Sequence, residues 1–266
     1  MRLLSILVLT GFTLSISAFA QGLSAVRETG ETYEQAQARS LMLYQLKNIE
    51  SFTQPDTYLR RTPMDVKVSL EKLDTTTIPQ LSSYEVLENE FKYIRDTRFF
   101  NSPDPKFPRR LTWLYPDDGC YARAEMAKIK LVEHKQIAPN KIFVFGNLNA
   151  STKNTFNGRV QWWYHVAATY RVDTKVYVFD PSIEPEHPLT LDEWHLAVGG
   201  AQTSVKYAVC APNAFDPNSN CERPVQTNIS DVISEQTDFL GPEWERVELL
   251  HRDPTKELGE FPPWLH

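Results

Sequence analysis

The segment Tyr115-Pro-Asp-Asp-Gly-Cys-Tyr-Ala-Arg-Ala-Glu125 combines a turn with the start of a helix. The Pro-Asp-Asp-Gly run at 116–119 interrupts regular structure, and an aspartate just before a helix is expected to cap its free N–H groups. We therefore predict a helix that begins at Cys120. A thiol in that position lies at the positive end of the helix dipole, which favours the nucleophilic thiolate. A buried and inert core cysteine is the alternative interpretation.

The N-terminus has the pattern of a secretory signal peptide. Arg2 supplies a positive charge, residues 3–16 are mostly apolar, and Ala18-Phe19-Ala20 is a small-x-small cleavage signature. We predict a signal peptide at 1–20, cleaved near Ala20, and a secreted or periplasmic protein. An uncleaved membrane anchor is the alternative, which the shortness of the apolar run disfavours.

The composition excludes several classes of partner and cofactor. The chain has 266 residues, a formal net charge of −6 and no block of Lys or Arg, so we expect neither nucleic acid nor a membrane as a partner. No glycine-rich phosphate loop is present. Prolines interrupt the acidic and histidine residues between Glu184 and His195, and no metal-ligand spacing results. We expect no metal, no other cofactor and a monomeric chain.

Three cysteines are an odd number, which is informative in an oxidising compartment. Cys210 and Cys221 flank a loop dense in turn residues, so we predict a disulfide between them. This pairing leaves Cys120 with a free thiol, which is either buried and inert or reactive.

The remaining patterns suggest an extension before one catalytic domain. We assign residues 21–79 to an N-terminal extension and residues 80–266 to the catalytic domain. The extension is predicted to contain a helix over 31–51 with an apolar stripe, and a short strand at 64–70. Further predictions are a helix that is capped by Ser82 or Ser83 and runs to about Arg98, strands at 111–115 and 141–145, and a helix at 190–198. The chain beyond Val209 is predicted to be rich in loops.

A β-hairpin is predicted from Val160 to Asp180, with Asp173-Thr174 as its turn. A loop of two or four residues centred on this turn places Ala167 opposite Asp180. His165, two residues earlier, then points to the same face as Asp180 and lies diagonal to it, at a Cβ separation of about 7 Å. A loop of odd length would put the two side chains on opposite faces.

A carboxylate bound to one ring nitrogen fixes the tautomer of a histidine, and the other nitrogen can then accept a proton from a thiol. Cys120, His165 and Asp180 are therefore candidates for a catalytic triad. The alternatives are a hydrogen-bonded histidine on a half-buried strand and an Asp-Pro turn at a strand end. Trp163, Tyr121 and Asn147 are weaker candidates for substrate binding, since strand aromatics more often belong to a core.

Four motifs resemble the protein-glutaminase family of secreted bacterial protein-glutamine deamidases. They are Tyr115-Pro-Asp-Asp-Gly-Cys-Tyr-Ala-Arg-Ala124, Phe143-Val-Phe-Gly-Asn-Leu-Asn-Ala-Ser-Thr152, Trp163-Tyr-His-Val-Ala167 and Phe179-Asp-Pro-Ser182. Leu189-Thr-Leu-Asp-Glu-Trp194 continues the match. The motifs follow the order and approximate spacing of the family, and together they surround each position of the candidate triad.

The resemblance implies an α+β fold with a papain- or transglutaminase-like core, in which a cysteine-bearing helix packs on an antiparallel sheet that carries His and Asp. It implies Cys120 as the nucleophile, His165 as the acid and base, and Asp180 as the residue that orients His165. The implied substrates are proteins with accessible glutamines, and no cofactor is needed. Enzymes of the family can be made with an inhibitory pro-segment, and residues 21–79 are a candidate for one by position.

Other functions remain open for the same residues. A Cys–His–Asp triad also cleaves peptide bonds or transfers acyl groups to lysine, so a cysteine peptidase or a transglutaminase is the alternative enzyme. A secreted binding module that keeps the fold without catalysis is the alternative from another class.

Overall fold

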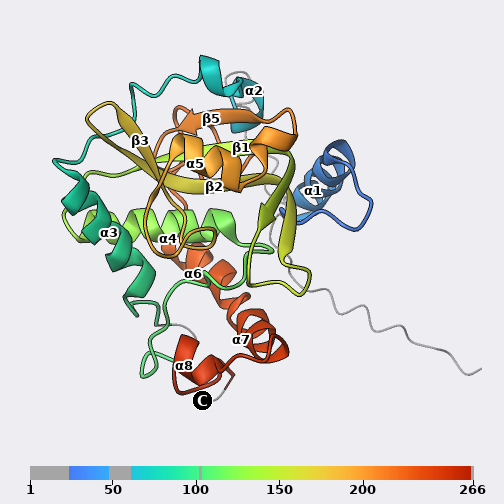
Figure 1. Cartoon of the computed structure of the whole chain (residues 1–266), viewed down its shortest axis with the longest axis vertical. Coiled ribbons are helices and arrows are strands. Elements are labelled where there is room, and N and C mark those ends of the chain that lie inside the picture. The colour runs from blue at the N-terminus through green and yellow to red at the C-terminus, as the bar shows by residue number, and fades with distance from the viewer. Residues whose placement is uncertain (1–23, 48–60, 102–103, 265–266) are drawn as a thin grey trace, which may run out of the picture.

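A five-stranded antiparallel sheet with β2 at its centre organises the chain (Figure 1). The computed structural model describes residues 24–47, 61–101 and 104–264. The strand order is β4-β3-β2-β1-β5, with bounds β1 Asn140–Ser151, β2 Arg159–Val172, β3 Lys175–Phe179, β4 Leu189–Thr190 and β5 Lys206–Cys210. The helices are α1 Tyr33–Lys47, α2 Pro63–Val66, α3 Tyr84–Asp96, α4 Cys120–Glu133, α5 Leu191–Ala197, α6 Ile229–Thr237, α7 Leu240–Leu249 and α8 Pro254–Leu258, with short 3₁₀ turns at Leu70–Lys72 and Gly200–Gln202.

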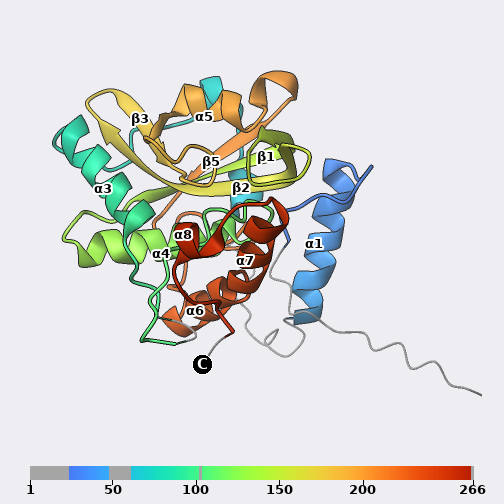
Figure 2. The ribbon, with the colours of Figure 1, turned by 60° about the horizontal axis from the view of Figure 1, so that its bottom comes forward.

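Strand β2 is buried on both of its faces. Every residue from Trp162 to Tyr170 is buried, although side chains alternate between the two faces of a strand. Helix α4 lies against one face of the sheet and α5 lies on the other (Figure 2). The aromatic and β-branched residues that predicted this strand therefore fill two layers of core.

Helix α4 packs on β2 and is itself largely enclosed. Its first nine residues, Cys120 to Lys128, are all buried. Gly119 precedes it with φ 78°, and a Cβ at Gly119 would lie 2.6 Å from the ring of Phe239. Only glycine fits both the left-handed backbone and the close ring. The predicted α+β fold, with the cysteine-bearing helix on an antiparallel sheet, is confirmed.

The described part of the N-terminal extension touches the sheet at two places. Near its start, Val26 forms a bridge with Trp162 in β2, and α1 follows at the side of the molecule (Figure 1). The predicted apolar stripe of this helix does not face a core, because Leu41, Met42 and Leu46 are exposed. Ala36 and Ser40 are buried instead. The end of the predicted helix, 48–51, lies outside the described residues.

The second place involves residues 61–81, which run along β5 and β2. The strand predicted at 64–70 is wrong: α2 occupies 63–66, and only Val68 pairs, in both directions, with the backbone of Tyr207. The Arg61 carbonyl accepts from the Cys221 N–H, and the Leu81 N–H donates to the Arg171 carbonyl. Val68 thus pairs with the free edge of β5, where the backbone groups of Tyr207 would otherwise lack partners.

One further prediction is wrong, one is incomplete and one is confirmed. The chain beyond Val209 is rich in loops, as predicted, but it also contains α6, α7 and α8, whose short apolar faces gave a weak periodic signal. Residues 111–115 form turns and no strand, although Leu111 to Leu114 are buried. The disulfide predicted between Cys210 and Cys221 is present. Within the described ranges, no helix has the length and apolar character that crossing a bilayer requires.

Candidate active site

Cys120 is the first residue of α4, and its side chain is buried with 3% exposure. The expected aspartate cap is absent: Gly119 is the N-cap residue, and Asp118 Oδ1 accepts from the Gly119 and Ala25 N–H groups instead. The first-turn amides of α4, including that of Cys120, have no helical carbonyl to bind. Because these amides carry the positive end of the helix dipole, the site favours a negative charge on or beside the sulfur.

His165 and Asp180 come from the two strands of the predicted hairpin. Strand β2 pairs with β3 from Val172↔Lys175 to Ala168↔Phe179, which is the register that the two-residue turn predicted. Asp173 takes φ 54° in that turn. The side chains of His165 and Asp180 meet as predicted, since the His165 Nε2 lies 2.7 Å from the Asp180 Oδ2.

Two further groups hold the Asp180 carboxylate. Trp194 Nε1, from α5, donates to the Oδ2 at 2.8 Å, and the Ser182 hydroxyl donates to the Oδ1 at 2.5 Å. Burial raises the pKa of Asp180, but the nearby His165 and these hydrogen bonds outweigh it and hold the pKa below its ordinary value. Asp180 is therefore a carboxylate with a fixed orientation.

The pKa of His165 is raised to about 9. Burial favours the neutral ring, but the charge and hydrogen bond of Asp180 outweigh it, and Cys120 adds to the same direction. Since Nε2 is taken by Asp180, the interaction with Cys120 falls to Nδ1, which has no hydrogen-bond partner of good geometry among the described residues. Cys120, His165 and Asp180 line one enclosed cavity of about 10 Å³.

Trp162 fixes His165 from the side. The two rings stack with centroids 4.5 Å apart and planes 10° apart. The Trp162 Nε1 donates to the carbonyl of Pro116, which belongs to the turn before Cys120. The Trp162 side chain thus connects the strand of His165 with the loop that precedes Cys120.

Arg123 fixes that loop from the helix. Its Nη1 donates to the carbonyls of Thr112, Tyr115 and Asp118, at 3.3, 3.0 and 2.6 Å. Arg123 is 2% exposed and also lines the enclosed cavity with Cys120. A buried guanidinium that binds three loop carbonyls keeps the turn in a single conformation.

Sequence reasoning did not assign roles to Trp194, Trp162, Arg123 or Ser182. The ring N–H contacts of Trp194 and Trp162 reach residues that are distant in the chain, and such contacts leave no local sequence pattern. Ser182 carried a usable signal: a serine two residues after an aspartate often bonds its carboxylate.

The predicted substrate residues lie elsewhere in the structure. None of Trp163, Tyr121 and Asn147 lines the enclosed cavity. The Tyr121 hydroxyl donates to Glu235 at 2.6 Å, and burial raises the pKa of Tyr121 well above its ordinary value. Their role in binding substrate stays a prediction.

Trp163 and Asn147 are contacted by the N-terminal extension. The Trp163 Nε1 donates to the Ser24 carbonyl at 3.0 Å. The Asn147 Oδ1 accepts from the Arg27 side chain at 2.9 Å and from the Tyr33 N–H at 3.0 Å. The extension therefore occupies two of the three positions that the sequence suggested for substrate.

No group of three or more His, Cys, Asp or Glu side chains in the described part of the chain is arranged to hold a metal ion. His195, which belonged to the metal pattern considered from the sequence, bonds the Tyr207 hydroxyl at 2.5 Å. His187 lies 3.9 Å from Glu184.

A family model described as glutaminase matches residues 87–198. This segment includes Cys120, His165 and Asp180, so the match spans every position of the candidate triad. The match agrees with the resemblance that the four sequence motifs predicted, and it supports a glutaminase-type enzyme.

Solved structures with similarity to the chain include three of protein-glutaminase. The NMR structure of protein-glutaminase from Chryseobacterium proteolyticum has 27% identity, with 60% of this chain and 88% of that chain covered and a TM-score of 0.49. A crystal structure of protein-glutaminase has 25% identity, coverage of 65% and 89%, and a TM-score of 0.42. One of pro-protein-glutaminase has 24% identity, coverage of 68% and 62%, and a TM-score of 0.43. None of the curated proteins compared with the chain matches it.

Proposed function

We propose that the protein hydrolyses the side-chain amides of glutamine residues in other proteins, giving glutamate and ammonia. The observation that carries the proposal is the 2.7 Å contact between His165 and Asp180 in a cavity that Cys120 also lines, within the segment that matches the glutaminase family. A thiol, a base and an orienting carboxylate are the groups that amide hydrolysis through a thioester requires.

In the proposed reaction, the Cys120 thiolate attacks the carboxamide carbon of glutamine. The raised pKa of His165 keeps its ring protonated at neutral pH, which supports an initial thiolate–imidazolium pair. The imidazolium gives its proton to the departing nitrogen, ammonia leaves, and a γ-glutamyl thioester remains. His165 then takes a proton from water, the hydroxide attacks the thioester, and the Cys120 thiolate is released with glutamate.

The developing oxyanion needs hydrogen-bond donors. The Cys120 N–H is the first donor in this proposal, because it belongs to the helix turn whose amides lack helical partners. The loop at 146–149 is the candidate for the second. No metal or organic cofactor takes part.

We further propose that residues 21–79 restrict access to the thiol. Ser24 and Ala25 contact Trp163 and Asp118, and the Cys120 side chain is almost fully buried. We also propose export, with cleavage near Ala20, as a monomer. The predicted signal peptide lies outside the described residues. The Cys210–Cys221 disulfide supports an oxidising compartment.

The test is ammonia release from casein by the wild type and by Cys120→Ala, with mass spectrometry of the product. We expect glutamine to become glutamate, with a mass increase of about 1 Da per site, only with the wild type. Shortened chains would point to a peptidase, and glutamine–lysine cross-links to a transglutaminase. No reaction, together with alkylation of Cys120 no faster than that of a free thiol, would point to a binding module.

A further inference from the structure

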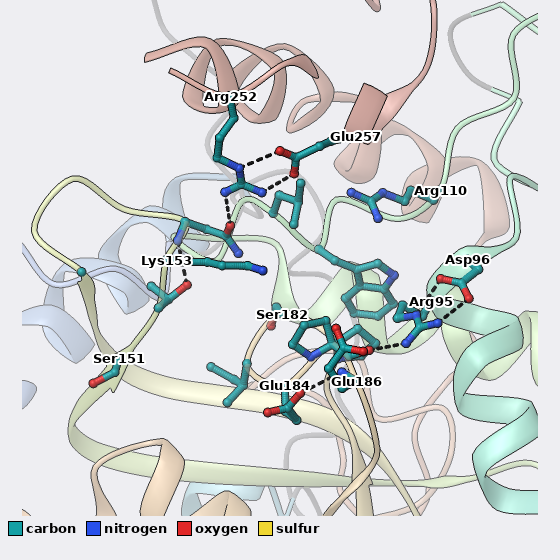
Figure 3. Close-up of a pocket in the computed structure, with 18 residues that line it drawn as sticks. Arg95, Asp96, Arg110, Ser151, Lys153, Ser182, Glu184, Glu186, Arg252 and Glu257 are labelled. Carbon is teal, nitrogen blue, oxygen red and sulfur yellow. Dashed lines mark hydrogen bonds and ion pairs between the residues drawn. The ribbon is translucent and has the colours of Figure 1, made fainter. Parts of the chain in front are cut away.

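A large open cavity borders the candidate active site. It has a volume of about 750 Å³ and lies between the core and the C-terminal helices (Figure 3). Trp113 lines this cavity and also the enclosed one that contains Cys120. Ser182, whose hydroxyl binds Asp180, is part of the same wall.

Two of the four cations in the cavity wall are already paired. Arg95 bonds the carboxylate of Asp96, and Arg252 bonds that of Glu257 (Figure 3). Within each of these pairs, the positive and the negative charge neutralise each other.

The other two cations, Arg110 and Lys153, have no such partner. Neither makes a hydrogen bond or an ion pair with a described residue, and the Nε of Arg110 is buried without a partner. Their side chains extend into the cavity from opposite sides (Figure 3). The Arg110 guanidinium also interacts electrostatically with the Glu243 carboxylate. Burial raises the pKa of Glu243 to about 7, however, which weakens the negative charge of Glu243 at neutral pH.

The acidic side chains on the opposite wall, Glu184 and Glu186, each interact with another group of the protein. Glu184 accepts from the Glu186 N–H at 2.8 Å and lies near His187, and Glu186 is close enough to Arg95 to raise its pKa. Arg110 and Lys153 are therefore the two cations of the cavity wall that lack an anionic partner among the described residues, although the whole chain is acidic. A partly buried guanidinium without an anion leaves donors unused, and a carboxylate is the group whose geometry matches them.

We infer that Arg110 and Lys153 form a subsite for a carboxylate side chain of the protein substrate, so that the enzyme prefers glutamines close to an aspartate or glutamate. This inference rests on the proposed function for its link to glutamine, but not for the binding itself. The cavity is large enough for several residues of an extended chain. Its shared wall with the triad places such a segment beside the reacting amide.

The experiment compares glutamine peptides in which one aspartate is walked residue by residue along both sides of the glutamine, each with a matched alanine peptide. The ratio of kcat/KM between the two members of a pair is measured within one protein preparation, so a general loss of folded enzyme cancels. Full-length wild type is compared with Lys153→Gln, Lys153→Glu and Arg110→Gln. Lys175→Gln is the matched control, since Lys175 is exposed and outside the cavity wall.

We expect the wild type to prefer aspartate at one or more positions, and more strongly at low salt. Each charge removed should lower the ratio by roughly twofold to fivefold, the range of partly exposed ion pairs. Lys153→Glu should lower the ratio further than Lys153→Gln does, and Lys175→Gln should keep the wild-type ratio. Equal ratios for all pairs in the wild type, or an aspartate preference that is undiminished in Lys153→Gln and Arg110→Gln, would overturn the inference. Lys153 is exposed, so its variants serve if Arg110→Gln does not fold.

Binding of the labelled peptides to Cys120→Ala, measured by fluorescence anisotropy, separates this inference from the proposed function. Tighter binding of aspartate peptides that Lys153→Gln weakens supports the subsite even if no ammonia is released, and then only the proposed function fails. Ammonia release with no aspartate preference in binding or turnover refutes the subsite and leaves the proposed function intact.

Discussion

The side chains of His165 and Asp180 meet diagonally across the end of the β2–β3 hairpin, with the Nε2 and Oδ2 atoms 2.7 Å apart. The contact forms just beyond the last paired residues, Ala168 and Phe179, where the strands separate and leave room for side chains. Trp162 stacks on the ring and Trp194 binds the carboxylate, so each partner is held independently of the other. The site is therefore preorganised before substrate arrives.

Replacing Asp180 should lower the pKa of His165. In Asp180→Asn the charge that outweighs burial is lost, so we expect the pKa to fall from about 9 to its ordinary value of 6.5 or below. An NMR titration of the His165 ring measures this shift directly. The rate of ammonia release should fall by on the order of 10²- to 10⁴-fold, the range seen when a base loses its orienting carboxylate.

Asp192→Asn is the control for this substitution, because Asp192 is exposed on α5 next to the site. We expect it to leave both the pKa and the rate unchanged. A His165 pKa that stays near 9 in Asp180→Asn would show that another group holds the proton.

Trp194 should act on the reaction through Asp180. Trp194→Phe keeps an aromatic ring on α5 but removes the N–H that binds the Oδ2. A hydrogen bond to a charged group contributes about 1.5–3 kcal/mol, so we expect a decrease in kcat of roughly tenfold to a hundredfold with KM little changed. The pH profile should shift to higher pH too, because an Oδ2 that no longer accepts from Trp194 binds the His165 imidazolium more strongly and raises the pKa of His165.

A purely structural role for Trp194 would give a different result. Unfolding temperature would then fall while the pH profile of the remaining activity stayed the same as that of the wild type. Trp244→Phe provides the comparison, since its N–H also binds a carboxylate, that of Glu248, but on α7.

Much of the candidate site could be predicted because it depends on local rules. The two-residue turn at 173–174 sets the register of the hairpin, and register alone decides that His165 and Asp180 share a face. The glycine and aspartates before Cys120 mark a helix start in the same way. The disulfide followed from a cysteine count and a short loop.

The rest depends on contacts between distant parts of the chain. Trp194 lies in a helix whose start was predicted, but its bond to Asp180 depends on how α5 folds back over the sheet. Asp118 fits the local pattern of a helix cap, yet it accepts from Ala25, which lies 93 residues away. Helices α6 to α8 were missed because they are short and each buries only a few apolar residues.

Cutting the chain between α1 and α2 should raise activity if the extension restricts access to Cys120. Residues 24–33 contact Asp118, Trp163 and Asn147, whereas residues 61–81 pair with β5 and β2. A specific protease site inserted between residues 48 and 60 should therefore release the first part and leave the second in place. After the cut, we expect Cys120 to be alkylated faster and ammonia to be released faster, each by about tenfold or more. A tenfold change in rate corresponds to a change in activation free energy of about 1.4 kcal/mol.

The uncut protein with the same insertion is the control for that experiment. Arg27→Ala offers an independent change, because it removes the side-chain bonds to Asn147 and to the Leu148 carbonyl without any cut. It should raise the alkylation rate in the intact chain, though less than the cut does. Unchanged alkylation after complete release of the first part would contradict a restricting role.

Glu243 should make the protein less stable above neutral pH. It is buried on α7, where its Oε1 accepts from the Leu114 N–H, and burial raises its pKa to about 7 against nearby arginines that lower it. The folded state therefore holds a proton that the unfolded state releases near pH 4.5. The stability from this group is fully present below that pH and is lost as pH rises through 7, by up to about 1.4 kcal/mol per pH unit.

Glu243→Gln keeps the acceptor oxygen and never ionises, so it should unfold at a higher temperature than the wild type at pH 8 and at nearly the same temperature at pH 4.5. Thermal unfolding followed by circular dichroism measures both, and Glu245→Gln, exposed on the same helix, should show no such difference between the two pH values. A lower unfolding temperature for Glu243→Gln at pH 8 would mean that the ionised carboxylate stabilises the cluster of arginines around it by more than its burial costs.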